Sequence, residues 1–270
     1  MIIGKNFFIT EIPKTGTSFL RNYFEKYKDV IITTHHDTVE HNKNIKLLKK
    51  KYKIGIIRSP YAWYLSYWRW SCLQKKISPL YNDLTSRRIK IRRLKLNLNL
   101  FNYIISQATK KTTKLKSLFF DINSKKNFNK FLDILLNAKF KNYISSDFSF
   151  IPYQDLGYMS HFFFYQNLLR KDYNILFENK KNFKKMIKVL DSKIFTNYYF
   201  RTENLTNDLK IFLRKNKIKV KNFKDLDRNA SSKKLDEDYI QFFTKKNLVL
   251  IENKENYLFK KFNYKKISKY

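Results

Sequence analysis

The chain has 270 residues, of which 43% are hydrophobic and 17% aromatic, so a largely disordered protein is excluded. It carries 57 Lys and Arg residues against 22 Asp and Glu, a formal net charge of +35. Such a surface attracts polyanions: nucleic acid, acidic lipid, or phosphorylated and sulfated ligands. Lys, Asn, Ile, Phe and Tyr are abundant and Gly and Pro are scarce, a bias that AT-rich codons also produce. The charge therefore supports an anionic ligand without identifying one.

The cysteine count and the hydropathy pattern bear on disulfides, metal sites and membrane spans. A single cysteine, Cys72, excludes an internal disulfide and a zinc site built from several cysteines. The first residues lead almost directly into a strand, without the charged and apolar pattern of a secretory leader. No apolar run approaches the ~20 residues that a helix needs to span a bilayer. We therefore expect a cytoplasmic protein without a membrane span.

Strands and helices alternate along the first part of the chain. The apolar run over 5–12 predicts a buried strand, and apolar residues at three- and four-residue spacing predict a helix over 17–28. The elements expected next are a strand at 29–34, a helix at 38–51, a strand at 53–58 and a helix at 59–74. Such alternation implies parallel pairing. The expected fold is α/β, a three-layer doubly wound parallel sheet flanked by helices.

The rest of the chain adds helices and one strand. The basic stretch from about 82 to 142 predicts helix, and we expect a helical insertion over approximately 80–150. A further strand is expected within 193–205, followed by a helix over 206–216 and a final amphipathic helix over 238–264. No internal repeat or domain boundary is evident, so residues 1–270 are expected to form a single domain.

The turn between the first strand and the first helix has the composition of a phosphate-binding loop. Such a loop holds an anion on backbone N–H groups at a helix N-terminus, with glycine for the tight path and lysine for charge. The ATP-binding pattern G-x-x-x-x-G-K-[ST] does not fit. Glu11 stands five residues before Gly16, Thr17 follows where the lysine should be, and the lysine lies earlier, at Lys14. The strand that might supply a Mg²⁺-binding aspartate ends in Arg58.

The sequence "PKTGTS" after a strand resembles the first signature of the PAPS-dependent sulfotransferases, and of their carbohydrate-specific members in particular. PAPS is 3′-phosphoadenosine-5′-phosphosulfate, the sulfuryl donor. The resemblance implies a fold related to the P-loop NTPases, in which this loop holds the 5′-phosphosulfate. The positions that match are Lys14, Thr15, Gly16, Thr17, Ser18 and Phe19. A helix capped after a turn, with no ligand, is the alternative.

The stretch "IGIIRSPYAWYLSYWRW" resembles the second signature of the same family. Its features are Arg58 at a strand end, Pro60 two residues later and Ser66 eight residues later. The resemblance implies that Arg58 and Ser66 hold the 3′-phosphate of the nucleotide. The chemistry agrees, since an arginine fork suits phosphate and doubly wound folds bind ligands at the carboxyl ends of strands. Alone, Arg58 is better explained as a surface charge at a strand end, and Ser66 as a helix hydroxyl bonded to its own backbone. Both residues at this spacing, about 40 residues after a matching loop, favour the resemblance.

The resemblance is loose over 193–264 and absent between about 80 and 140. It implies a strand ending at an acidic residue, Glu203, before Leu205. A polar loop could approach the nucleotide or be merely solvated. Its residues are Arg228, Asn229, Ser231 and Ser232.

Sulfuryl transfer requires positioning, charge stabilisation and a base. Lys14 is the expected cation at the departing nucleotide, and no metal is expected. The family's base commonly follows the second strand, where His36 is the first choice and His35 nearly as good, because histidine titrates near neutrality. Asp37 and Glu40 are the other candidates. The same cluster could instead be a polar loop without chemistry or, less often, part of a metal site.

The expected reaction transfers the sulfuryl group from PAPS to a hydroxyl acceptor, by default on a glycan or glycolipid, and leaves 3′-phosphoadenosine 5′-phosphate (PAP). The basic middle of the chain and the aromatic run 162–165 are expected on the acceptor side, although such a run is more often core. Three alternatives stay open: a nucleotide or small-molecule kinase with an atypical loop, a basic nucleic-acid-binding protein, and a non-catalytic relative. No nucleic-acid recognition motif is present, so no specific nucleic-acid partner is expected. The sequence predicts no oligomeric state.

Overall fold

The computed structural model describes residues 1–34, 38, 51–89, 98–144, 146–178, 182–218 and 239–268. They form an α/β protein with two compact parts, here called unit 1 and unit 2. Unit 1 comprises Met1–Ser59, Phe162–Tyr173 and Lys188–Glu237; unit 2 comprises Pro60–His161, Asn174–Ile187 and Asp238–Tyr270. The stretch expected as a helical insertion lies within unit 2.

Unit 1 contains a five-stranded mixed sheet with the strand order β3-β1-β2-β4-β5. The strands are β1 (Ile2–Ile3), β2 (Phe7–Ile9), β3 (Ile31–Ile32), β4 (Tyr52–Ile57) and β5 (Tyr198–Arg201). β2 pairs with β4 and β4 with β5 in parallel, whereas β1 is antiparallel to both β2 and β3. It follows that β2, β3, β4 and β5 all run in one direction, with their carboxyl ends at the same edge of the sheet.

The prediction of an all-parallel sheet is wrong, because it did not include β1, which is antiparallel to both of its neighbours. β1 forms a hairpin with β2, closed by the hydrogen bond from Gly4 N to the carbonyl of Phe7 (2.9 Å). Ile2 then faces Ile9 on one side and Ile32 on the other, so β1 separates β3 from β2. Two adjacent isoleucines carry too little periodicity to predict a strand.

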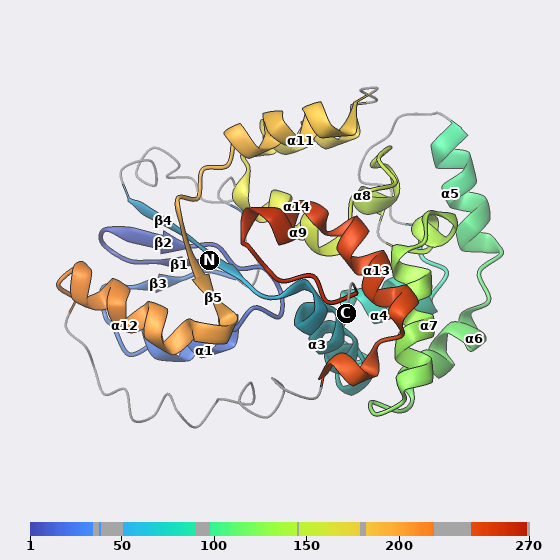
Figure 1. Cartoon of the computed structure of the whole chain (residues 1–270), viewed down its shortest axis with the longest axis horizontal. Coiled ribbons are helices and arrows are strands. Elements are labelled where there is room, and N and C mark those ends of the chain that lie inside the picture. The colour runs from blue at the N-terminus through green and yellow to red at the C-terminus, as the bar shows by residue number, and fades with distance from the viewer. Residues whose placement is uncertain are drawn as a thin grey trace. The chain divides into compact units, whose positions relative to one another are not determined.

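One face of the sheet is covered by α1 (Thr17–Phe24) and α12 (Leu205–Lys215), which run below the strands in Figure 1. Both helices present apolar residues at helical spacing, as the sequence predicted. The core on this face consists of Ile2, Phe7, Ile9, Leu20, Tyr23, Phe24, Ile54, Ile56, Phe200, Leu205, Leu209, Phe212 and Leu213. At roughly 25 cal/mol per Å² of buried apolar surface, this cluster is a principal source of the unit's stability.

The opposite face of the sheet packs on the segments around Leu169 and Phe195. Phe8 contacts the ring of Phe195, with the centroids 5.9 Å apart. Beside them the buried Asn167 side chain accepts hydrogen bonds from Thr10 Oγ1 (3.3 Å) and Thr196 Oγ1 (2.5 Å). The sheet of unit 1 therefore has covering segments on both faces.

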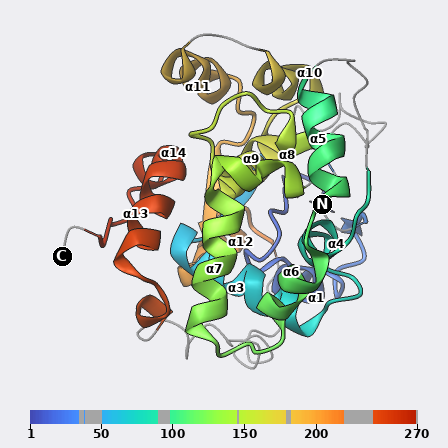
Figure 2. The ribbon, with the colours of Figure 1, turned by 90° about the vertical axis from the view of Figure 1, so that its right-hand side faces the viewer.

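Unit 2 is helical. Helix α7 packs against α3 and α13, and Figure 2 shows all three helices. The helices are α3 (Pro60–Leu73), α4 (Pro79–Thr85), α5 (Leu98–Ala108), α6 (Thr112–Lys116), η2 (Ser117–Phe119), α7 (Lys125–Leu136), η3 (Ala138–Tyr143), α8 (Ser146–Ser149), η4 (Asn174–Phe177), η7 (Tyr239–Phe242), α13 (Lys245–Lys254) and α14 (Asn256–Lys261). Helices α9 (Tyr158–Asn167) and α11 (Phe183–Ser192) cross the unit boundary, and α10 (Arg170–Tyr173) and η5 (Thr202–Asn204) belong to unit 1. In the described ranges no helix combines the length and apolar character required to cross a membrane.

The continuous helix expected over 238–264 is wrong, because the chain breaks twice. Thr244 caps α13, accepting a hydrogen bond from Asn247 N (3.3 Å). Glu255 then leaves the helical conformation, with φ −100° and ψ 17°. Its buried carboxylate accepts hydrogen bonds from Met159 N (3.0 Å) and Ser160 N (2.9 Å), and so caps α9 from a distant part of the chain. Periodicity in the sequence cannot reveal such a distant partner.

Two of the four residues in the aromatic run expected on the acceptor side belong to the core, whereas Phe162 and Tyr165 are half-buried. Phe163 and Phe164, in α9, have no exposed surface. Phe163 stacks against Tyr199 of β5, with the ring centroids 5.9 Å apart. Packing explains these aromatic side chains without a ligand.

Candidate functional site

The loop between β2 and α1 adopts a conformation that glycine favours. Gly16, the N-cap of α1, lies in the left-handed region with φ 89° and ψ 17°. Lys14 also has a positive φ of 66°, which is uncommon for a residue with a side chain. Two left-handed residues in three turn the chain sharply at the N-terminus of α1, where the helix dipole favours an anion.

Side chains from within and outside the loop fix its backbone. Thr15 Oγ1 donates to the carbonyl of Ile12 (2.8 Å). Thr202 Oγ1 lies 2.9 Å from the carbonyl oxygen of Thr15 and 3.1 Å from that of Ile57, so it can donate to either. Thr202 thus connects the loop to the ends of β4 and β5. The sequence did not single it out, although it directly follows the strand residue Arg201 and precedes Glu203.

Arg58 lies beside the loop. It directly follows β4, and because β2 and β4 are parallel, Arg58 and the loop emerge at the same edge of the sheet. Its Nη1 donates to the carbonyl of Lys14 (3.2 Å), and the residue as a whole is 9% exposed. The structure therefore brings together the lysine of the first signature and the arginine of the second.

The two cations in this site repel each other. Burial lowers the pKa of Lys14 to about 8, and the charge of Arg58 contributes to the same shift. A bound anion would offset this repulsion and raise the pKa again. Glu203, also at this edge, accepts a hydrogen bond from Ser59 N (2.5 Å) and contributes one negative charge nearby.

A buried ion pair links Glu11, which precedes the loop, to Arg21 of α1, which follows it. Arg21 of α1 donates through Nε to Glu11 Oε1 (2.7 Å), and through Nη2 to Oε2 of the same carboxylate. Glu11 also accepts from the Met1 amino group (2.7 Å), and it has no exposed surface. Burial raises the pKa of Glu11, but the hydrogen bond from Arg21 and the neighbouring positive charges outweigh it, so the pKa lies below its usual value. Glu11, which replaces the first glycine of the ATP-binding pattern, is therefore a structural anchor.

The remaining residues of the first signature differ in exposure. Thr17 is buried, whereas Ser18 is exposed. Phe19 is half-buried and packs against the core beneath α1, which explains its aromatic side chain without a ligand. Ser66 of the second signature is half-buried in α3, and α3 belongs to unit 2.

The four candidate bases follow β3 in the sequence. His35, His36, Asp37 and Glu40 lie outside the described residues. The polar-loop residues Arg228, Asn229, Ser231 and Ser232 lie outside them too. The backbone leading to His35 is fixed, however, because Arg21 donates to the carbonyls of Thr33 (2.8 Å) and Thr34 (3.1 Å). The chain therefore leaves β3 at the same sheet edge as the loop.

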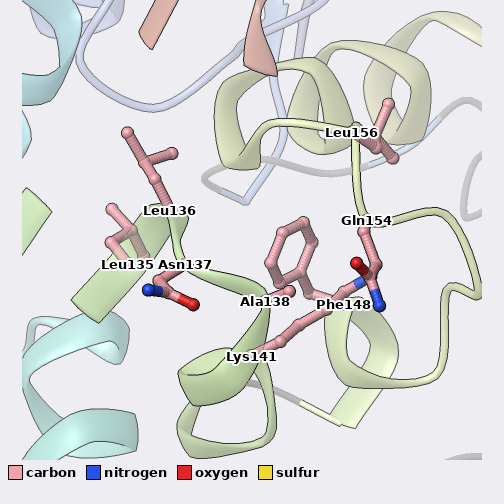
Figure 3. A pocket seen from close by; sticks show the side chains of 8 residues that line it. All are labelled: Leu135, Leu136, Asn137, Ala138, Lys141, Phe148, Gln154 and Leu156. Atoms are coloured by element: carbon pink, nitrogen blue, oxygen red, sulfur yellow. The ribbon is translucent and has the colours of Figure 1, made fainter. Parts of the chain in front are cut away.

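A pocket in unit 2 is too small for a nucleotide. It has room for about one water molecule, at about 10 Å³. Figure 3 shows its lining: Leu135, Leu136, Asn137, Ala138, Lys141, Phe148, Gln154 and Leu156. Burial, and then the charge of Lys254, lower the pKa of Lys141 to about 7, but its Nζ already donates to the carbonyls of Ile151 (2.5 Å) and Tyr153 (3.1 Å). Lys141 therefore stabilises this part of unit 2.

Metal-binding side chains do not cluster within the described part of the chain. Among the described residues, no group of three or more His, Cys, Asp and Glu side chains is placed to hold a metal ion. The loop and Arg58 offer cations and N–H donors, which bind anions rather than metals.

Replacing Gly16 with alanine is expected to destabilise the protein through two separable effects. The left-handed conformation costs a residue with a Cβ roughly 1–2 kcal/mol. The added Cβ would also lie 2.6 Å from Leu205 Cδ2. Leu205→Ala removes that collision, so the double variant should be less destabilised than the sum of the two single variants. Urea unfolding of the four proteins measures the coupling, and strict additivity would contradict the predicted contact.

Comparisons with known proteins identify no family for the chain. No family model, no curated protein and no solved structure matches it. Any function must therefore be argued from the chemistry of its own residues.

Proposed function

We propose that the chain is a PAPS-dependent sulfotransferase with a P-loop-related fold, which transfers a sulfuryl group to an acceptor hydroxyl, by default on a carbohydrate. One observation carries the proposal. Lys14 and Arg58, which belong to separate motifs, lie close enough at the N-terminus of α1 for Arg58 to bond the Lys14 carbonyl and to add to the lowering of the Lys14 pKa by burial. A pair of cations at a helix N-terminus suits a ligand with several negative charges.

The donor has two anionic groups, and each of the two sequence motifs would bind one of them. The 5′-phosphosulfate would bind at the loop, on backbone N–H groups and the Lys14 ammonium. The 3′-phosphate would bind Arg58, with Ser66 as the second expected partner. The buried Glu11–Arg21 pair and Thr202 would keep the loop rigid, which preserves the geometry needed for transfer.

The transfer then needs a cation at the leaving group and a base that takes the acceptor proton. The acceptor oxygen attacks sulfur in line, the bond between sulfur and the bridging oxygen breaks, and PAP departs. The Lys14 ammonium stabilises the negative charge that develops on the bridging oxygen. The acceptor proton passes to His36 or His35, with Asp37 and Glu40 as the alternatives.

Calorimetric titration with PAP, beside ATP with Mg²⁺, tests the proposal directly. Wild-type protein should bind PAP without a metal and in preference to Mg·ATP. Arg58→Ala should weaken PAP binding at least about tenfold, because charge-assisted hydrogen bonds contribute about 1.5–3 kcal/mol each. Arg58→Lys should restore the affinity only in part, because lysine lacks the planar fork.

The matched control is Arg214→Ala, which removes an exposed arginine from α12. It should leave PAP binding unchanged apart from a small effect of net charge. Equal losses in the Arg58 and Arg214 variants would indicate attraction by the basic surface alone. Preference for Mg·ATP would favour the kinase alternative.

A further inference from the structure

The three most exposed large apolar side chains among the described residues belong to one region of unit 2. They are Leu73, Ile77 and Phe120, with 69%, 66% and 71% of their surface exposed. Leu73 ends α3, Ile77 lies in the turn before α4, and Phe120 follows η2. Lys75 Nζ lies 5.0 Å from the centroid of the Phe120 ring, which joins the turn to the end of η2. We call these three side chains the apolar tip.

Hydrogen bonds hold the backbone beneath the apolar tip in place. The hydroxyls of Ser71 and Ser78 lie 2.8 Å apart and close the base of the turn. Asn82 Nδ2 donates to the carbonyl of Lys76 (3.1 Å). Trp68 Nε1 donates to the carbonyl of Leu118 (3.2 Å) and fixes η2 to α3. The exposure therefore belongs to an ordered part of the fold, and a clustered apolar surface of this kind marks an interaction site.

The charges around the apolar tip are mostly positive. Residues 73–78 and 112–122 contain four lysines against the single aspartate Asp121. Lys76 is exposed within the turn, and Lys114 and Lys116 are exposed on α6. Apolar side chains with lysines beside them match the boundary between anionic headgroups and acyl chains.

We propose that the apolar tip docks this protein on an anionic membrane surface. Leu73, Ile77 and Phe120 enter the headgroup boundary, and the neighbouring lysines bind lipid phosphates. A lipid surface fits better than a protein partner, because a stable protein interface usually buries about 800 Å² on each side, with a packed apolar centre. Three side chains at two helix ends and in one turn, interspersed with lysines, form no such centre. The proposal is independent of the reaction proposed above.

Co-sedimentation with lipid vesicles tests this docking. Vesicles of phosphatidylcholine with about 30% phosphatidylserine represent an anionic surface, and pure phosphatidylcholine is the neutral comparison. The triple variant Leu73→Ser/Ile77→Ser/Phe120→Ser keeps the charge of the protein. It should reduce partitioning onto the anionic vesicles at least about tenfold, because burial of apolar surface is lost. Lys75→Glu/Lys76→Glu should also reduce it, more strongly at low salt.

The matched control is Ile31→Ser/Tyr52→Ser/Ile211→Ser, which removes three exposed apolar side chains from unit 1. It should bind vesicles as the wild type does. Thermal unfolding of both triple variants checks that each is folded. Equal binding by wild type and by the triple variant of the apolar tip (the tip variant) would overturn the proposal, since attraction would then come from net charge alone. Absence of wild-type binding, or a dimer in solution that the tip variant abolishes, would overturn it too.

Discussion

Replacing Lys14 with methionine is expected to lower the rate of sulfuryl transfer by about 10²–10³-fold, the usual loss when one group that stabilises transition-state charge is removed. Methionine keeps the length and the apolar stem of lysine and removes only the ammonium. The rate is measured as release of PAP from PAPS, with a mixture of desulfated glycans, or water alone, as acceptor. Folding should not suffer, because burial and Arg58 both disfavour the charge in the free protein.

The pH dependence of PAP binding tests the same residue. With a pKa of about 8, Lys14 loses its proton as the pH rises through 8, so affinity should fall between about pH 7 and 9. Binding near pH 8 should take up protons, which titrations in buffers of different ionisation enthalpy detect. The Lys14→Met variant should take up fewer protons. A variant with wild-type turnover and wild-type proton uptake would exclude Lys14 from the site.

Lys14 also has a predictable effect on stability. Its pKa is lowered from 10.5 in the unfolded chain to about 8 in the folded one. Between these values the unfolded chain binds more protons, so this residue makes stability rise with pH from about 8 upward. The rise should be absent in Lys14→Met.

Replacing Glu11 with glutamine should have the largest effect on stability, a loss of about 3–5 kcal/mol, because Arg21 is left buried without its carboxylate. For a chain of this size that corresponds to a fall in Tm of roughly 6–20 °C. The Glu11 carboxyl has a lowered pKa, so its contribution is complete above about pH 4.5 and is lost as the pH falls through the lower folded value. The gap between wild type and Glu11→Gln should therefore narrow in acid.

The control for this prediction removes both partners. Glu11→Gln/Arg21→Met removes the buried guanidinium together with the carboxylate and leaves only the Met1 amino group without its carboxylate partner, so it should recover part of the lost free energy of unfolding. Urea unfolding at pH 7 and pH 3 measures all three proteins. A single variant as stable as wild type at pH 7 would mean that the ion pair does not anchor the loop.

The sequence predicted the elements with strong local patterns. Strands β2 and β4 and helices α1 and α12 fall where alternation and helical spacing placed them. β1 escaped notice because two isoleucines become a strand only through pairing with β2 and β3. The break at Glu255 escaped notice because its cause is the backbone of α9, almost a hundred residues earlier. Both errors arise from pairing and capping contacts that local periodicity does not encode.

The candidate site could be predicted only in part for the same reason. Spacing identified Lys14, Gly16 and Arg58, because short motifs retain the order of residues around a turn or a strand end. Thr202 and the Glu11–Arg21 pair became evident only once the strands were assembled. The roles assigned to Ser66, His35 and His36 stay predictions.

The pairing of β4 with β5 has a consequence for synthesis of the chain. Lys53 and Asn197, just outside the paired residues, are 144 positions apart. At roughly 5–20 residues per second, on the order of ten seconds pass on the ribosome between the two strands. During that interval Ile54 and Ile56 lack their core contacts with Phe200 and α12. The hydrogen bond from Thr202 to the loop has not yet formed either. The loop between β2 and α1 and its contact with Thr202 would then be among the last parts of unit 1 to become native, and a nascent chain stalled in this interval should be prone to aggregation.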